Sequence, residues 1–266
     1  MNTVSIAGVG LIGGSFALAL RAAGFAVRII GVGSVETTGK ALARGVIDEA
    51  LPLAEAAAVS DLIYLAQPIR KILELIDQLD AWVRPGALIT DAGSTKAAIV
   101  ARAAEKIQRA RFIGGHPMAG KESRGVEYAD AGLFADCPYV LTARDAELES
   151  WVERMGARLV FLDAGEHDRL IAVASHVPQL ASVALAATIG EAGAEQVAGP
   201  GAVDMTRLAM SSYEIWRDIL ATNADSIGSA LDAYMAKLEQ LRAQLTGEEM
   251  AAGFARAAGV ARSLRN

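Results

Sequence analysis

A glycine-rich loop near the N-terminus constrains the fold of this chain more than any other feature. Gly8-Val9-Gly10-Leu11-Ile12-Gly13 follows an apolar, β-branched run and opens a stretch with helical periodicity. In such a strand–loop–helix unit the first glycine permits a tight turn, the second lets the backbone approach a pyrophosphate, and the third allows close helix–strand packing. The phosphate charge then lies at the helix N-terminus. Because a glycine turn without a ligand rarely opens such a unit, we predict dinucleotide binding by Gly8, Gly10, Leu11, Ile12 and Gly13.

The first 163 residues alternate short apolar runs with helical patterns, which is typical of a parallel sheet with crossover helices. The expected strands are Val4–Ala7, Val27–Val32, Asp61–Ala66, Ala87–Asp91, Arg111–Gly114, Tyr139–Thr142 and Arg158–Leu162. The expected helices are Gly13–Ala23, Thr37–Arg44, Ile69–Leu79, Thr95–Gln108 and Ala146–Met155. We therefore predict an α/β fold in which residues 1–163 form a Rossmann-type dinucleotide-binding domain.

Helical periodicity alone follows Asp163, over about 166–190, 203–222, 224–245 and 248–263. Several of these segments, such as Leu180–Ala187, carry apolar residues on more than one face. A helix that is apolar nearly all round must be buried in a bundle or against another subunit. Four helices make a thin domain, so we expect residues 164–266 to form an all-helical domain that makes a homodimer.

Composition narrows the class of protein. The 266 residues have a net charge of −6 and a pI near 5.2, which argues against nucleic acid or an anionic membrane as a partner. The longest apolar run, Leu170–Ile189, is interrupted by polar residues, so we expect no membrane span. A single cysteine, Cys137, and the lack of a basic segment before Val4 favour the cytoplasm. We expect no metal site, and an anionic substrate would need local cations.

The choice between NAD and NADP depends on the end of the second strand. NAD binding favours an acidic residue there, but the sequence places Gly33 at about that position, followed by Ser34. Ser34, Thr37 and Thr38 could donate to a 2′-phosphate, whereas no arginine is adjacent and Glu36 could still reach a hydroxyl. We favour NADP, or use of both cofactors. Other loops expected at the same crevice contain Gln67, Pro68 and Gly93.

One of the three histidines lies in the segment Gly114-Gly115-His116-Pro117-Met118-Ala119-Gly120. We interpret the flanking glycines as allowing the backbone to approach a ligand closely, and His116 as a proton-handling group facing a nicotinamide. Ser94 follows the strand that ends at Asp91, and it could cap the next helix, donate to a substrate oxygen or orient His116.

Two further polar residues lie in apolar helical sequence. His176, in Ser175-His176-Val177-Pro178-Gln179, is either a satisfied core histidine or part of the site. Arg207 also has apolar neighbours and needs a carboxylate, either from the protein, such as Asp204 or Asp218, or from a substrate.

Five motifs in this order resemble the prephenate/arogenate dehydrogenase family of tyrosine biosynthesis. They are Gly8 to Ser15, Asp91-Ala-Gly-Ser94-Thr-Lys96, Gly115 to Gly120 with Glu122 and Gly125, His167-Asp168 with Ser175 to Pro178, and Asp204-Met-Thr-Arg207-Leu-Ala with Trp216 to Ile219. The resemblance covers nearly the whole chain. It implies oxidative decarboxylation of a dianionic cyclohexadienol to 4-hydroxyphenylpyruvate or tyrosine, with hydride transfer to NAD(P).

The resemblance also implies roles for individual residues. His116 matches the histidine that takes or polarises the hydroxyl proton, a task for an imidazole that is neutral near pH 7. Ser94 matches the residue that links this histidine to the substrate. His176 and Arg207 match a substrate-anchoring pair that supplies local cations, and Glu122 matches a residue at the pocket mouth.

Two departures leave the choice between prephenate and arogenate open. Val203 stands where many prephenate-preferring members have a lysine, and the neutral Gln179 stands where many have a histidine. Two other functions compete with this one. A related hydroxy-acid dehydrogenase would typically have a catalytic lysine early in its helical domain, but 166–190 and 203–222 contain none. A non-catalytic dinucleotide sensor would have little need for His116, His176 and Arg207 together.

Overall fold

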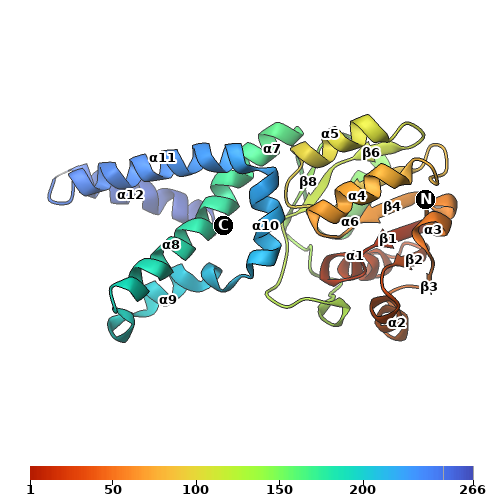
Figure 1. Cartoon of the computed structure of the whole chain (residues 1–266), viewed down its shortest axis with the longest axis horizontal. Coiled ribbons are helices and arrows are strands. Elements are labelled where there is room, and N and C mark those ends of the chain that lie inside the picture. The colour runs from red at the N-terminus through yellow and green to blue at the C-terminus, as the bar shows by residue number, and fades with distance from the viewer. Residues whose placement is uncertain (248, 266) are drawn as a thin grey trace.

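The computed structural model describes residues 1–247 and 249–265, and its centre is a six-stranded parallel sheet (Figure 1). The strands are β1 (Thr3–Ala7), β2 (Arg28–Val32), β3 (Glu49–Ala50), β4 (Leu62–Leu65), β5 (Leu88–Asp91) and β6 (Arg111–Ile113). Their order is β3-β2-β1-β4-β5-β6, so the winding direction reverses between β1 and β4. Such a reversal opens a crevice beyond the carboxyl ends of the strands, where ligands of this sheet type bind.

Helices cover both faces of the sheet: α1 (Leu11–Ala22), α2 (Val35–Ala43), α3 (Leu53–Val59), α4 (Ile69–Leu79) and α5 (Ala97–Lys106). In α4 the buried residues recur at helical spacing and include Ile69, Ile72 and Ile76, which pack with α5 on one face. On the other face Phe16 of α1 stacks on Tyr64 of β4 with ring centroids 3.9 Å apart. Each such buried side chain contributes about 1.5–3 kcal/mol to the hydrophobic driving force.

The last two expected strands form, but in a separate three-stranded sheet. β7 (Gly115–Pro117) pairs antiparallel with β8 (Pro138–Leu141), which pairs parallel with β9 (Arg158–Phe161). A short 3₁₀ turn (Val126–Tyr128) precedes β8, and α6 (Ala146–Arg154) joins β8 to β9. Tyr139 of β8 reaches the main core, where its hydroxyl donates to the Tyr64 hydroxyl at 3.2 Å. The second sheet therefore fixes β7, the strand that contains His116.

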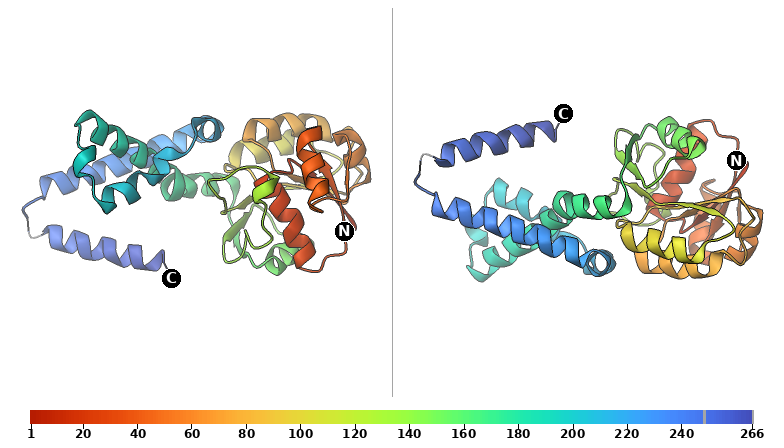
Figure 2. Two further views of the ribbon diagram at one scale, coloured as in Figure 1. Left: turned by 90° about the horizontal axis from the view of Figure 1, so that it is seen from below. Right: turned by 90° about the horizontal axis from the view of Figure 1, so that it is seen from above.

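The rest of the chain is helical and extends away from the sheets (Figures 1 and 2). Its elements are α7 (Ala164–Ile171), a π-turn (Ala172–His176), α8 (Val177–Glu191), a 3₁₀ turn (Glu195–Val197), α9 (Pro200–Thr206), a 3₁₀ turn (Arg207–Met210), α10 (Tyr213–Thr222), α11 (Ala224–Ala243) and α12 (Glu249–Ser263). The helix expected over 166–190 exists with a π-turn inside it. Residue 248, the expected start of the last helix, lies outside the described residues.

The prediction of one helix over 203–222 is wrong, because the chain leaves the helix at Ser211 and Ser212. Both have extended backbone, with ψ near 137°. Their hydroxyls hold this break: Ser211 Oγ accepts from Trp216 Nε1 at 3.0 Å, and Ser212 Oγ accepts from Arg124 at 2.8 Å. Serine also favours turns and helix ends over helix interiors, a preference that apolar periodicity does not reveal.

The helical part buries little apolar surface by itself. Its core cluster holds Ala172, Val177, Ile227 and Ala230, while Val173, Met235 and Phe254 are among the exposed apolar side chains. The continuous helical stretch Ala164–Glu191 is long and apolar enough to cross a membrane by length and composition, although a third of its most apolar window is buried. Of the polar residues that interrupt its apolar run, His176, Gln179 and Ser182 are buried within the protein, whereas Thr188 is exposed.

Candidate active site

The glycine loop has the geometry that its sequence motif predicts. Gly8 has φ +98°, and a Cβ there would lie 2.4 Å from the Ala66 carbonyl oxygen. At Gly13 a Cβ would lie 2.2 Å from the Gly8 carbonyl oxygen, so α1 packs directly on the loop. At Gly10, the residue before α1, a Cβ would meet nothing within 4 Å. The first and third glycines are thus required by the fold, and the second leaves open space at the N-terminus of a 12-residue helix.

The other residues predicted to bind cofactor differ in their surroundings. Gln67 follows β4 and lies beside Gly8, where its Cγ would be 2.6 Å from an added Cβ, and Pro68 immediately precedes α4. Gly33 and Ser34 are exposed just after β2, and Ser34 Oγ caps α2 by accepting from Thr37 N at 3.2 Å. Gly93 is buried, and a Cβ there would lie 2.6 Å from Ile99 Cδ1. Close packing of the Ile99 side chain therefore explains why residue 93 is a glycine, without a contact to cofactor.

The prediction that Thr38 could donate a hydrogen bond to a 2′-phosphate is wrong. Thr38 is buried, and its hydroxyl donates to the Ser34 carbonyl oxygen at 3.0 Å inside α2. The hydroxyls of Ser34 and Thr37 remain at the surface.

A cleft of about 870 Å³ lies between the loop that follows β7 and the helical part. It brings together all six residues predicted to act on substrate: Ser94, His116, Glu122, His176, Gln179 and Arg207. These residues come from two separate segments of the sequence, 94–122 and 176–207, and the fold places them around one cleft. The sequence motifs do not reveal that Lys121, Arg124 and Trp216 also line this cleft.

A buried ion pair positions the strand that contains His116. Lys96 and Asp91 are both fully buried, and Lys96 Nζ contacts the Asp91 carboxylate. Lys96 Nζ also donates to the Gly115 carbonyl oxygen at 2.8 Å, and Asp91 accepts from Gly115 N at 3.1 Å. A Cβ at Gly115 would lie 2.6 Å from the Asp91 carbonyl oxygen. The expectation that Gly115 makes room for a ligand is therefore wrong, because it makes room for the backbone of β5.

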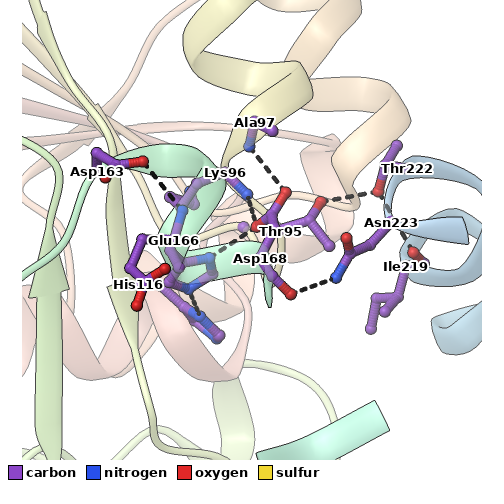
Figure 3. Close-up of polar contacts among 12 residues, drawn as sticks. Thr95, Lys96, Ala97, His116, Asp163, Glu166, Asp168, Ile219, Thr222 and Asn223 are labelled. Atoms are coloured by element: carbon purple, nitrogen blue, oxygen red, sulfur yellow. Dashed lines mark hydrogen bonds and ion pairs between the residues drawn. The ribbon is translucent and has the colours of Figure 1, made fainter. Parts of the chain in front are cut away.

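His116 is only 8 % exposed, and its ring belongs to a buried chain of three side chains (Figure 3). Its Nδ1 lies 2.8 Å from His167 Nε2, and His167 Nδ1 lies 2.7 Å from Asp168 Oδ1. Burial lowers the pKa of His116 well below 6.5, and the neighbouring His167 and Lys96 act in the same direction. The imidazole is thus neutral at pH 7, as a proton acceptor must be.

Asp168, not Ser94, caps the helix that follows β5. Asp168 Oδ1 accepts from Lys96 N at 2.7 Å, and Oδ2 accepts from Ala97 N at 2.9 Å, at the start of α5 (Figure 3). Of the alternatives for Ser94, the helix cap is therefore wrong. Ser94 is half-buried at the cleft wall, where it can contact a ligand.

His176 is 1 % exposed and lies edge-on to Trp216, with ring centroids 5.8 Å apart. Burial lowers its pKa to about 4, although the nearby Asp168 opposes this shift. His176 is therefore neutral at pH 7 and does not supply the cation expected of it. It can offer a substrate a hydrogen bond, but not a charge.

Arg207 is exposed, contrary to the apolar surroundings predicted for it. Its guanidinium contacts Glu122 at 3.5 Å, and neither Asp204 nor Asp218 is its partner. Asp218 instead contacts Arg217 at 3.2 Å and accepts from Arg70 N at 3.1 Å. Apolar neighbours in sequence did not mean burial here, because the 3₁₀ turn at 207–210 lies along the cleft.

Two side chains of α8 hold that turn in place. Gln179 Nε2 donates to the Leu208 carbonyl oxygen at 2.8 Å, and Ser182 Oγ accepts from Ala209 N at 3.0 Å. Gln179 thus orients the segment that contains Arg207 as well as lining the cleft.

Comparison with known proteins identifies the family. Models described as the nucleotide-binding domain and the dimerization domain of prephenate dehydrogenase match residues 16–164 and 163–257. The chain belongs to the prephenate dehydrogenase family. A prephenate dehydrogenase of Lactococcus lactis is 35 % identical over 254 residues, which are 92 % of this chain and 72 % of that protein.

Solved structures agree with this assignment. A crystal structure of prephenate dehydrogenase from A. aeolicus in complex with hydroxyphenyl propionate and NAD+ is 30 % identical, with a TM-score of 0.90 over 100 % of this chain and 99 % of that one. Arogenate dehydrogenase from Synechocystis is 31 % identical, with a TM-score of 0.86 over 98 % and 99 %.

These findings confirm the resemblance to prephenate and arogenate dehydrogenases, the fold class, and the prediction of an NAD(P)-dependent oxidoreductase. The helical part is the dimerization domain of the family. A 3-hydroxyisobutyrate dehydrogenase shares only the fold, with 18 % identity and a TM-score of 0.53.

Proposed function

We propose that this enzyme oxidatively decarboxylates prephenate, arogenate or both, and reduces NAD(P) as it does so. The observation that supports this best is a neutral His116 in a cleft that also holds the exposed cations Arg207, Arg124 and Lys121. A dianionic cyclohexadienol needs both features, namely a base for its ring hydroxyl and positive charge for its carboxylates.

The glycine loop fits a dinucleotide. The space at Gly10, the N-terminus of α1 and the tight turn at Gly8 suit a pyrophosphate, and Leu11 and Ile12 begin the helix beneath it. We propose that Gln67, Pro68 and Gly93 flank the nicotinamide end, and that Gly33 and Ser34 lie at the adenosine ribose. When bound, the nicotinamide accepts the hydride from the hydroxyl-bearing ring carbon.

We favour NADP or use of both cofactors. A carboxylate at the end of β2 would repel a 2′-phosphate, but the residue there is Gly33, and the hydroxyls of Ser34 and Thr37 are at the surface. Lys40, one turn further along α2, already contacts Glu36 and Glu127 at 2.9 Å. It therefore adds no unpaired charge for a phosphate.

The protein's part in the chemistry is proton transfer and anchoring. We propose that His116 takes the hydroxyl proton, and that Ser94 hydrogen-bonds the same oxygen. Arg207 would bind a substrate carboxylate, and Glu122, its exposed partner, would lie at the pocket mouth. His176 would donate a hydrogen bond to the substrate. Gln179 is neutral and would therefore repel neither prephenate nor arogenate. Loss of carbon dioxide then makes the ring aromatic.

We also propose that the two domains are residues 1–163 and 164–266, that the enzyme is a cytoplasmic homodimer, and that nucleic acid and membrane are not partners. The exposed apolar side chains of the helical part, such as Met235 and Phe254, support burial against a second copy. The net charge of −6 disfavours polyanions.

Steady-state assays of prephenate and arogenate against NAD and NADP test the proposal. His116→Asn should lower kcat by about 10²–10⁴, the usual contribution of a general base, and should change substrate and cofactor affinities far less. Thr95→Val is the matched control, since Thr95 directly follows Ser94 in the chain but its hydroxyl is hydrogen-bonded to the Thr222 hydroxyl, at 2.8 Å, and not to a residue of the site. A parent enzyme inactive with all four combinations, or near-normal turnover by the His116 variant, would refute the proposal.

A further inference from the structure

We propose that His167 and Asp168 act as positioning residues that fix the tautomer of His116, with its proton on Nδ1 and the lone pair of Nε2 facing the cleft. This inference rests on the proposed role of His116 as the base. It assigns a task to two buried residues that the proposed reaction does not otherwise use.

The direction of each hydrogen bond in this chain is set from Asp168. Its carboxylate accepts backbone N–H groups from Lys96 and Ala97, at 2.7 and 2.9 Å. Its own backbone carbonyl accepts from Asn223 Nδ2 at 2.8 Å, which holds α7 against the start of α11 (Figure 3). An ionised carboxylate can only accept hydrogen bonds. His167 Nδ1, at 2.7 Å from Asp168 Oδ1, must therefore carry a hydrogen and donate it.

The orientation of each further hydrogen bond follows from the first. A neutral imidazole has one donor and one acceptor nitrogen, so His167 Nε2 is an acceptor. His116 Nδ1 lies 2.8 Å from that atom and must be its donor. The remaining nitrogen, His116 Nε2, then holds a lone pair on a ring that lines the cleft. A doubly protonated His167 would reverse both directions, and the tautomer measurement described below would detect it.

The third histidine has the opposite arrangement. Asn223 Nδ2 must be a donor because it serves the Asp168 carbonyl oxygen, and the same nitrogen lies 3.4 Å from His176 Nδ1. His176 Nδ1 is therefore the acceptor, and its hydrogen is on Nε2. In the cleft, His116 can thus accept a proton at Nε2, and His176 can donate a hydrogen bond from Nε2. The tautomer of His116 depends on Asp168 through His167, and that of His176 depends on Asn223.

The tautomers can be measured directly in the intact protein. With only three histidines in the chain, ¹⁵N-imidazole labelling and two-bond ¹⁵N–¹H correlation resolve every ring, and His116→Asn, His167→Gln and His176→Asn assign them. We expect the hydrogen on Nδ1 in His116 and His167 and on Nε2 in His176, which serves as the internal control. A hydrogen on Nε2 of His116 would overturn the proposal. This readout needs no turnover, so it is independent of whether the proposed reaction occurs.

Kinetics separate positioning from a merely structural role. His167→Leu removes the acceptor and should lower kcat by about 10²–10⁴ with little change in KM, comparable to losing a tautomer-fixing carboxylate in a catalytic triad. His167→Gln can accept from His116 through Oε1 and donate to Asp168 through Nε2, so it should recover most of the loss. Thr95→Val is again the matched control. Equal loss in the Leu and Gln variants, or none in either, would overturn the proposal.

Discussion

Replacing Lys96 by methionine should destabilise the protein strongly, because Lys96 neutralises a carboxylate that has no access to water. Both Lys96 and Asp91 are 0 % exposed. Burial raises the pKa of Asp91 and lowers that of Lys96, which shows how costly either charge would be without its partner. Methionine keeps most of the side-chain volume, so the loss is electrostatic and not a cavity effect.

The magnitude follows from what remains buried. In Lys96→Met the Asp91 carboxylate keeps two backbone donors, Gly93 N and Gly115 N, but no positive charge. Breaking a buried pair in this way costs about 3–5 kcal/mol. For a domain of this size about 2–4 °C of melting temperature is lost per kcal/mol, which predicts a fall in Tm of roughly 6–20 °C.

Urea unfolding followed by circular dichroism measures this loss. Lys71→Met is the matched control, since Lys71 contacts Glu74 at 3.0 Å with both side chains about half exposed, and such a pair contributes about 0–1 kcal/mol. Adding Asp91→Asn to Lys96→Met should recover part of the loss, because it removes the unpaired charge. If Lys96→Met costs no more than Lys71→Met, the buried pair does not hold β7 in the way we infer.

Four further predictions concern the cofactor, the substrate, and the pH dependence of activity and of stability. Gly33→Asp fits sterically, because the new Cβ would lie 3.6 Å from Thr38 Cγ2. Its carboxylate should repel the 2′-phosphate and raise the KM for NADP about tenfold or more, with little change in the KM for NAD. If variant and parent use NADP equally well, Gly33 does not lie at the 2′ position. Arg207→Ala should raise the substrate KM about tenfold or more. It should shift stability by less than about 1 kcal/mol, because its ion pair with Glu122 is exposed. A large loss of Tm at constant KM would contradict this. The acid limb of kcat/KM, which reports groups of the free enzyme, should lie well below pH 6.5 and vanish in His116→Asn. Because His116 and His176 are held neutral in the folded state, unfolding takes up protons below about pH 6.5, so the free energy of unfolding should fall as the pH drops toward about 4; a flat urea-unfolding profile over this range would contradict it.

Periodicity and turn chemistry were sufficient to predict most of the fold. Buried parallel strands read as short apolar runs, and Gly24 and Gly45, both with positive φ, end the first two helices where the sequence predicts. The short strand Glu49–Ala50 and the helix Leu53–Val59 were not predicted, because neither has a distinctive pattern. The separate sheet of β7, β8 and β9 depends on pairing between residues 115 and 141, which no local signal encodes.

The sequence was sufficient to predict individual site residues whose type alone indicates their chemistry. It was not sufficient to predict contacts between side chains from distant segments. His116, Ser94, His176 and Arg207 each stood out by their sequence surroundings, and all four line the same cleft. The link from His116 to His167 and Asp168 was missed, because packing of α7 against the start of α5 creates it. The dipeptide His167-Asp168, in a chain with three histidines, was the one sequence feature that indicated such a contact. It does not reveal whether His167 contacts His116 or His176.

The cleft keeps its positively charged side chains apart from the histidine that we propose as the base. At its buried end, burial keeps His116 and His176 neutral, so each can offer only a hydrogen bond whose direction its neighbours set. At its mouth, Arg207 and Arg124 are exposed to water and contact the carboxylates of Glu122 and Glu214. Burying an unpaired cation beside His116 would cost far more than placing it at the rim. A protein of net charge −6 can thus bind a dianion at exposed cations while its buried base stays unprotonated at pH 7.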